Sequence, residues 1–239
     1  IQARGALKKE LTAHLRTHRK LRRPKLAAGK RHTRGHIIDA VSIRERPAEV
    51  EDRAVPGHWE GDLIAGSRGS HIATLVERHS RFVMLVKVEA KDTTSVVTAL
   101  SRQVRRLPAQ LRKSLTWDQG FELASHKQFT VATDVAVYFC DPRSPWQRGS
   151  NENANGLLRQ YWPKRNSMAN LSQRECNQVA YKINSRPRKR HGYLSPLQLI
   201  NQVLHLVVEF TRPVVVEGNS TKPPGLLLFE VKRLRRSLQ

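Results

Sequence analysis

HWEGDLIAGSRGSHIATLVERHSRFVMLVKVEA, residues 58–90, holds three consecutive runs rich in β-branched and aromatic residues. The short segments SRGS and HSR separate these runs and supply turn-forming residues, which is typical of strands that pair with their sequence neighbours. The segment GSRGS lacks the Lys-Ser or Lys-Thr ending of a phosphate-binding P-loop, so we interpret it as a hairpin turn. The stretch therefore predicts an antiparallel meander of three strands.

Helical and strand-like segments alternate after this meander. A helix is expected over residues 92–107, where Asp92 is a suitable N-cap and apolar residues recur along one face. SLTWD (114–118) and VAVYFCD (135–141) have the composition of short strands, and the segment 125–134 between them is expected to be helical. Three strands followed by this αβαβ order predict an α/β fold with a five-stranded mixed sheet flanked by helices.

Two further helices are expected after the fifth strand. The first follows a loop and has Ser150 as its expected N-cap, and the second covers residues 172–185. The basic segment RPRKRHGYLSP, residues 186–196, ends the second helix. Core packing is the expected role of three tryptophans beside the acidic motifs, with base stacking as the alternative: Trp59, Trp117 and Trp146.

The charge balance indicates the class of partner. The chain has 239 residues, with 43 Lys and Arg against 20 Asp and Glu, which gives a formal net charge of +23. Such an excess favours a polyanion, and nucleic acid is the first candidate. No apolar run is long enough to cross a bilayer, and no long amphipathic helix suits a membrane surface. The two cysteines, Cys140 and Cys176, lack CxxC spacing, which excludes a zinc ribbon and favours a reducing, intracellular compartment.

A basic arm forms the N-terminal part of the sequence. Residues 1–35 contain a single acid, Glu10, among many Lys and Arg. Leu7, Leu11 and Leu15 recur at helical spacing and predict a short amphipathic helix. Two interpretations stay open for this arm, which are a solvated tail and a segment that contacts DNA.

Three carboxylates fall on separate predicted elements. Asp62 lies in the first strand, Asp118 ends the fourth strand, and Glu152 opens the helix after the fifth strand. Acids from distant segments that converge are what a divalent-metal site needs, because Mg²⁺ prefers a few carboxylate oxygens together with water and phosphate. Two such ions can promote phosphoryl transfer by acting on both the attacking and the leaving oxygen.

The residues alone leave rival acids open. Glu60 shares a strand face with Asp62, because side chains alternate along a strand. Glu152 has a favourable setting, since a first-turn acid suits the helix dipole and small residues follow it on the same helix face. The other acids that remain as alternatives are Glu122, Asp134 and Asp141.

Five ordered motifs carry a resemblance that covers about residues 46–196: VPGHWEGDLI, TLVERHSRF, LTWDQGFELASHKQF, VYFCDPRSPWQRGSNENANGLLRQYWP and NSRPRKRHGYLSP. Together they resemble the catalytic domain of the IS-thirty family of bacterial insertion-sequence transposases, within the DDE transposase and retroviral-integrase group. The resemblance implies that Asp62, Asp118 and Glu152 are the catalytic acids and metal ligands. The 33 residues at positions 119–151 match the interval that the family pattern expects between the last two acids.

The same resemblance implies an RNase H-like fold, dependence on Mg²⁺ or Mn²⁺, and a DNA partner. The implied reaction has two stages, in which water first cleaves a phosphodiester at the transposon end and the freed 3′-hydroxyl then attacks target DNA. A homo-oligomer on DNA and a bacterial, cytoplasmic, nucleoid-associated location are also implied. The residues expected to contact DNA are Lys20, Arg22, Arg23, Arg148, Arg159, Arg186, Arg188, Lys189 and Arg190.

The expected organisation has three parts. Residues 1–45 are a basic helical arm, a remnant of or linker from a helix-turn-helix domain that the family carries ahead of its core and that we expect to be missing from this sequence. Residues 46–200 are the RNase H-like core, and residues 201–239 are a tail that is unlike the family's ending and has no assigned role. The functional hypothesis is a transposase, and the alternative is a non-catalytic DNA-binding protein derived from a degenerate transposase. The end sequence, target preference and oligomeric state do not follow from these residues.

Overall fold

The computed structural model describes residues 5–14, 37–51 and 53–211. Its contacts divide the chain into residues 1–36 and residues 37–239, and each unit is described by itself. Within the first unit, α1 spans Gly5–Ala13, where Leu7 and Leu11 are exposed. The predicted short helix is therefore present, while Leu15 lies outside the described residues.

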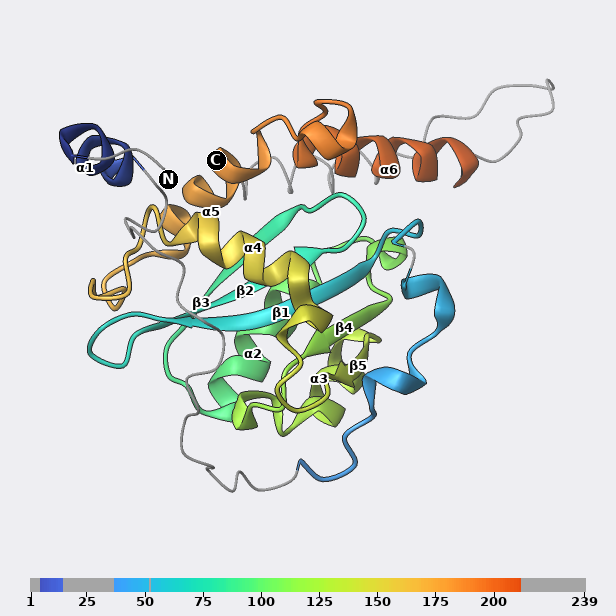
Figure 1. Cartoon of the computed structure of the whole chain (residues 1–239). Coiled ribbons are helices and arrows are strands. Elements are labelled where there is room, and N and C mark those ends of the chain that lie inside the picture. The colour runs from blue at the N-terminus through green and yellow to red at the C-terminus, as the bar shows by residue number, and fades with distance from the viewer. Residues whose placement is uncertain (1–4, 15–36, 52, 212–239) are drawn as a thin grey trace. The chain divides into compact units, whose positions relative to one another are not determined.

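A five-stranded mixed sheet forms the centre of the second unit (Figure 1). The three strands of the predicted meander, β1 (His58–Ala65), β2 (His71–Glu77) and β3 (Val83–Val88), pair antiparallel. β4 (Ser114–Trp117) then pairs parallel with β1, and β5 (Ala136–Phe139) pairs parallel with β4. The strand order is β3-β2-β1-β4-β5, which confirms the mixed sheet and its αβαβ continuation.

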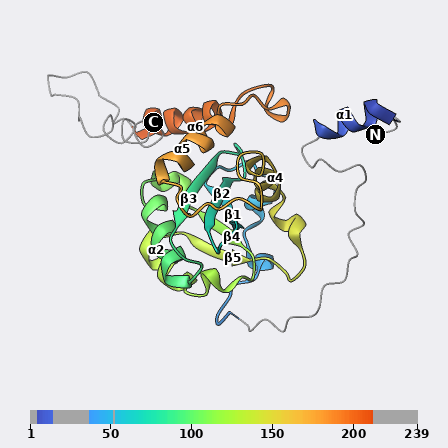
Figure 2. The ribbon, with the colours of Figure 1, turned by 90° about the vertical axis from the view of Figure 1, so that its left-hand side faces the viewer.

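Helices cover both faces of this sheet (Figure 2). α2 (Thr93–Val104) and α3 (His126–Thr133) pack with one apolar cluster, and α4 (Gly149–Leu158) and α5 (Gln173–Asn184) pack with the other. α6 (Pro196–Thr211) follows and buries Ile200. The short 3₁₀ segments are Ile43–Glu45, Ala48–Val50, Ala109–Leu111, Phe121–Leu123, Pro145–Arg148 and Lys189–His191.

Side-chain alternation along β1 sends neighbouring residues to opposite clusters. Trp59 belongs to the cluster with α2 and α3, and Ile64 belongs to the cluster with α4 and α5. Trp117 packs in the core with Trp59, as predicted. Trp146 is 70% exposed, so its expected core role is wrong, because it lies in a 3₁₀ turn that runs over the surface before α4.

Local signals account for several boundaries. The Asp92 side chain accepts a hydrogen bond from the Ser95 amide (2.8 Å), which confirms the predicted N-cap of α2. The hairpin turn after β1 is confirmed too, since the Gly66 amide donates to the Ser70 carbonyl (2.8 Å). Cys140 and Cys176 are buried free thiols. In the described ranges, no helix is long and apolar enough to span a membrane.

His58 opens β1 with a buried imidazole. Its Nδ1 lies 2.7 Å from the Ser114 hydroxyl, and its Nε2 lies 3.8 Å from the Glu49 carboxylate. Burial lowers the pKa of His58 to about 4; repulsion from Lys113 adds to this effect and Glu49 opposes it. The imidazole is therefore neutral in the folded protein near pH 7.

We expect acid to destabilise the core through His58. Its folded-state pKa of about 4 lies below the ordinary value of 6.5, so the unfolded chain takes up the proton first. This contribution to stability is complete above about pH 6.5 and is lost as the pH falls toward 4. The Tm of the unaltered protein should fall more steeply across that window than the Tm of His58→Asn, measured by circular dichroism. Equal slopes in the two proteins would contradict the prediction.

Candidate functional site

A buried glutamate holds the start of α4. Glu60 in β1 is fully buried, and its Oε2 accepts hydrogen bonds from the backbone amides of Ser150 (2.8 Å) and Asn151 (3.0 Å). Its Oε1 accepts from the Ser150 hydroxyl (3.0 Å) and from Arg78 Nη1 (3.1 Å). Glu60 thus satisfies amides that a helix N-terminus leaves free, and its charge faces the positive end of the helix dipole.

The N-cap expected at Ser150 is wrong. α4 begins at Gly149, and the residue at the cap position, Arg148, makes no side-chain cap bond. Ser150 instead lies in the first turn, because the capping carboxylate comes from Glu60 on another element.

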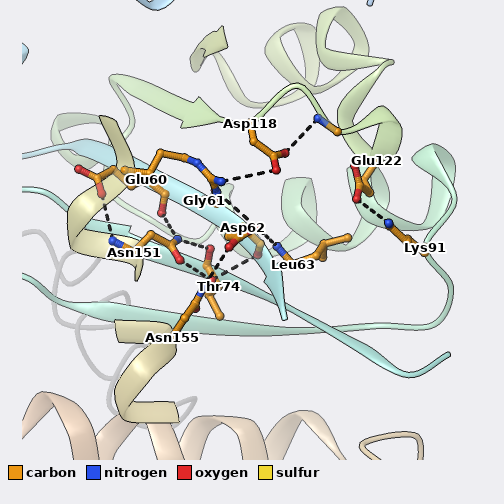
Figure 3. Close-up of polar contacts among 12 residues, drawn as sticks. Glu60, Gly61, Asp62, Leu63, Thr74, Lys91, Asp118, Glu122, Asn151 and Asn155 are labelled. Carbon is orange, nitrogen blue, oxygen red and sulfur yellow. Dashed lines mark hydrogen bonds and ion pairs between the residues drawn. The ribbon is translucent and has the colours of Figure 1, made fainter. Parts of the chain in front are cut away.

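Asn151 joins the same helix to two strands. Its Nδ2 donates to the Glu60 carbonyl (2.8 Å) and to the Thr74 carbonyl (3.1 Å), and its Oδ1 accepts from the Thr74 hydroxyl (3.0 Å) (Figure 3). All three residues are fully buried. The amide side chain therefore satisfies backbone groups of β1 and β2 and sets the position of α4 over the sheet.

The sheet register brings Asp62 and Asp118 side by side. Glu60 pairs with Thr116 across the parallel strands β1 and β4, and each acid lies two residues further along its chain. Arg148 reaches both carboxylates, with Nη1 at 3.3 Å from Asp62 Oδ1 and Nη2 at 3.5 Å from Asp118 Oδ2. Figure 3 shows the two carboxylates directed toward a common region. The two acids therefore share one positive charge.

Hydrogen bonds orient both carboxylates. Asp62 Oδ2 accepts from Asn155 Nδ2 of α4 (2.9 Å), and Asp62 Oδ1 accepts from the Leu63 amide (2.9 Å). Asp118 Oδ1 accepts from the amide of Gly120 (3.0 Å). A Cβ at position 120 would lie 2.8 Å from that same oxygen, so the glycine permits this close approach. Each acid keeps a defined direction without a bound ligand.

Burial and the neighbouring opposite charge shift the pKa values of Asp62 and Arg148 in opposite directions. Burial raises the pKa of Asp62; Arg148 opposes this rise, and Asp118 adds to it. Burial lowers the pKa of Arg148, but the carboxylates of Asp62 and Asp118 outweigh it and the net pKa is raised. Arg148 therefore stays charged, although only 10% of its side chain is exposed.

Glu152 lies on α4, the helix that contacts Asp62. It is exposed in the first turn of α4, three residues before the Asn155 that bonds Asp62. Residues three apart are neighbours on a helix surface. Among the described residues, no three His, Cys, Asp or Glu side chains are gathered closely enough to hold a metal. The structure thus brings two of the three predicted acids together and places the third on the adjoining helix.

Comparison with known proteins identifies the lineage. Residues 52–145 match the integrase core domain family, a segment that includes Asp62 and Asp118 and ends before Glu152. The chain is 48% identical over 200 residues to the transposase InsI for insertion sequence element IS30A of Escherichia coli, covering 81% of this chain and 52% of that protein. It is 50% identical over 202 residues to the transposase for insertion sequence element IS1086 of Cupriavidus metallidurans, covering 84% and 59%.

The chain belongs to the IS-thirty family. The integrase core match and the mixed sheet confirm the RNase H-like fold that the motifs implied. This family member spans about half the length of the curated relatives that it matches, since it covers 52% and 59% of the two transposases. A chain of the simian T-cell lymphotropic virus intasome, solved in complex with PP2A regulatory subunit B56 gamma, overlays with a TM-score of 0.49 at 17% identity. That overlay covers 71% of this chain and 60% of the viral one.

The rival acids have other contacts in this IS-thirty family member. Glu122 pairs with Lys91 at 3.0 Å, and Asp141 pairs with Arg44 at 3.4 Å. Asp134 ends α3 in the left-handed conformation, with φ of 59°. Glu60, the remaining rival, anchors α4. Each of these acids thus has a contact or position of its own, although the Glu122 and Asp118 carboxylates both lie beside Gly120.

The predicted DNA-contacting residues fall in different settings. Lys20, Arg22 and Arg23 lie outside the described residues. Arg148 is buried and engaged by the two aspartates. Arg159 is half-buried at the end of α4, where its Nη1 lies 3.4 Å from a backbone carbonyl of the following turn.

The basic segment after α5 is more open. Arg186 hydrogen-bonds to the Tyr161 hydroxyl and lies over the ring of Tyr161, 5.7 Å from its centroid. Arg188 is half-buried and donates to a carbonyl of the last turn of α5 (3.2 Å). Lys189 and Arg190 are exposed. These four residues form one surface segment, whereas Arg148 belongs to the acid pair.

Three functional details were missed at the sequence level. Glu60 was weighed as a rival ligand, although its real role is to anchor α4, and Asn151 was not considered. The contact of Arg148 with the two acids was also not foreseen, and its expected contact with DNA stays a prediction. The period-2 pattern that placed Glu60 beside Asp62 was the one available signal, because it put both on the face that α4 covers.

We expect Glu60→Gln to destabilise the protein by about 3–5 kcal/mol, because it leaves the buried guanidinium of Arg78 without its charge partner. The same change weakens the acceptor for the first-turn amides of α4. Urea denaturation followed by tryptophan fluorescence measures the effect.

The matched control is Asp39→Asn, which removes an exposed ion pair with Lys127 (2.5 Å). Exposed pairs contribute little, so this variant should unfold close to the unaltered protein. Similar losses in the two variants would rule out a special role for Glu60.

Proposed function

We propose that this chain carries the catalytic core of a transposase, which cleaves DNA at the ends of its element and joins the freed 3′-hydroxyl to target DNA. The observation that carries the proposal is the shared cation of Asp62 and Asp118 on adjacent parallel strands. Membership of the IS-thirty family supports the reaction class. The net charge of +23 supports DNA as the partner.

Asp62, Asp118 and Glu152 are the proposed ligands of Mg²⁺ or Mn²⁺. The donor set fits such an ion in kind, since all three offer carboxylate oxygens and two of them already face one positive charge. When bound, divalent ions would activate the attacking oxygen and stabilise the leaving oxygen of the phosphodiester.

The chain's own residues would hold this arrangement. Asn155 and the Gly120 amide orient the two aspartates through bonds of 2.9 Å and 3.0 Å. Arg148 balances their negative charge in the protein alone. When metal ions take its place at the carboxylates, the guanidinium of Arg148 would still be nearby and could contact the phosphate being cleaved.

The wider assignments belong to the same proposal. The partners are the element ends and a target duplex, bound by a homo-oligomer in the bacterial cytoplasm at the nucleoid. Residues 1–45 would be the basic arm, 46–200 the core and 201–239 the tail. α6 (Pro196–Thr211) crosses the last boundary, so the tail would begin inside a helix.

We expect Asp118→Asn to abolish metal-dependent cleavage while leaving DNA binding intact. Loss of one metal ligand removes several kcal/mol of transition-state stabilisation, so the cleavage rate should fall by about 100-fold or more. Cleavage and strand transfer are measured on a labelled duplex with Mg²⁺ and with Mn²⁺, and binding by gel retardation.

Asp141→Asn is the matched control, because Asp141 is also an acid at the end of a strand but pairs with Arg44. It should keep cleavage within a few-fold of the unaltered chain. If the unaltered chain binds DNA and never cuts with either metal, the protein is a DNA-binding module and the catalytic proposal fails.

A further inference from the structure

Three segments bring basic side chains together beyond the N-terminal end of β1. The His79 imidazole contacts the Arg53 carbonyl (3.0 Å), which places the loop before β1 against the turn between β2 and β3. Asn184 at the end of α5 bonds both the amide and the carbonyl of Val83 (2.8 Å each), which brings the chain after α5 to the same turn. Arg53, Arg81 and Arg190 come from these three segments.

Among the described residues, no carboxylate forms an ion pair with these three guanidinium groups, although Glu51 and Glu60 act on Arg53 and Arg81 through their charge. Arg53 and Arg81 are both half-buried, and the Nε of each is buried without a hydrogen-bond partner. Arg190 is exposed, and no ion pair reaches any of the three within the described residues. Paired arginines such as Arg78 and Arg148 also have an unpartnered Nε, so it is the gathering of positive charge, and not this atom alone, that favours an anionic ligand here.

Three neighbouring carboxylates that the structure describes each have other hydrogen-bond or ion-pair partners. Glu60 is used by α4 and Arg78. Glu77 accepts from the amides of Gly57 (3.2 Å) and Ser80 (2.6 Å), among others. Glu51 pairs with the guanidinium of Arg46. The surplus charge in this cluster is therefore positive.

Repulsion between the three arginines also indicates a surplus of positive charge in this cluster. The pKa of Arg81 is lowered to about 10, first by burial and then by repulsion from Arg190 and Arg53, while the carboxylate of Glu60 opposes the shift. Burial also lowers the pKa of His191, with Arg190 and Arg81 adding to the effect. In addition, Arg53 and Arg81 both adopt left-handed backbone conformations, with φ of 63° and 64°. Such strained, like-charged placement costs stability and is typical of a binding site.

We propose that Arg53, Arg81 and Arg190 form a binding site for a phosphate group of the DNA backbone. Arginine suits this ligand, because its planar fork donates two parallel hydrogen bonds to phosphate oxygens. The site is separate from the acids and rests on DNA as the substrate under the proposed function.

The site's position relative to the acids follows from the strand register. Glu77, just before the turn that carries Arg81, pairs with Trp59 on β1, three residues before Asp62. Strands rise ~3.3 Å per residue, so the cluster begins roughly 10 Å along β1 from Asp62. The site would therefore hold a phosphate of the backbone other than the one being cleaved.

The test compares Arg81→Gln with Arg102→Gln in the full chain. Arg102 is exposed on α2, which packs on the opposite face of the sheet, so the control loses the same charge away from the cluster. Affinity for a short fluorescein-labelled duplex is measured by anisotropy across a salt series in EDTA. Without divalent metal no cleavage is possible, so a failure of the catalytic proposal leaves this result unaffected.

The salt dependence of binding should change in Arg81→Gln and not in Arg102→Gln. The slope of log affinity against log salt should fall by about 0.9, the value for one phosphate contact, whereas Arg102→Gln should keep the original slope. Arg190→Gln, which alters an exposed residue and does not endanger folding, should repeat the effect. Equal slopes for all four proteins would overturn the proposal.

Inorganic phosphate separates the two sources of the ligand. At matched ionic strength, phosphate should raise the Tm of the unaltered chain and of Arg102→Gln above the value in chloride, and should not do so for Arg81→Gln. A phosphate-specific rise without any change in the DNA slope would assign the site to a free anion and overturn the DNA assignment.

Stability in the absence of phosphate and DNA distinguishes a binding role from a structural one. In chloride, Arg81→Gln should melt at the same temperature as the unaltered chain or higher, because the change relieves repulsion from Arg53 and Arg190. A marked drop in Tm would make Arg81 a structural residue and contradict the proposal.

Discussion

The buried carboxylate of Glu60 is the contact on which the arrangement of the site depends. It takes hydrogen bonds from two amides and a hydroxyl at the start of α4 and from Arg78, with no exposure to water. A buried charge is tolerated only when it is fully paired, and this one is paired by two separate parts of the chain. Because the helix that carries Glu152 and Asn155 begins at this carboxylate, its position over β1 follows from the Glu60 contacts.

The chain as a whole and the site carry charges of opposite sign. The chain as a whole is strongly basic, with a formal charge of +23, yet two aspartates stand next to each other at the centre of the sheet. Arg148 places a buried positive charge next to both aspartates. The acids therefore remain close together despite their mutual repulsion.

Much of this architecture follows from local patterns. Alternating strand residues, the Asp92 cap and the helix after β4 were all predictable, because each depends on residues close in sequence. Asp62 and Asp118 could be nominated from their strand positions, but the selection of the three acids rested on the family resemblance. Asp62 and Asp118 share the guanidinium of Arg148, and the catalytic and metal-binding roles of all three acids remain predictions.

The features that escaped prediction depend on distant partners. The cap of α4 comes from Glu60, which lies 90 residues before Ser150, and no local rule for helix starts could indicate it. Arg148 lies against acids from two strands, and this contact depends on residues 30 or more positions away, so no local pattern could indicate it. Trp146 had the composition of a core residue, and the path of its turn leaves it exposed.

Glu60 and Asp62 lie on the same face of one strand, separated by a single residue. Sliding β1 by one position would turn both carboxylates away from α4, and sliding it by two would put the helix anchor where the site acid belongs. A mispaired sheet thus loses helix docking and acid pairing at once. The nuclease chemistry proposed for this chain would then arise only in molecules that have paired their strands in the correct register, so an incorrectly folded molecule would not cut DNA.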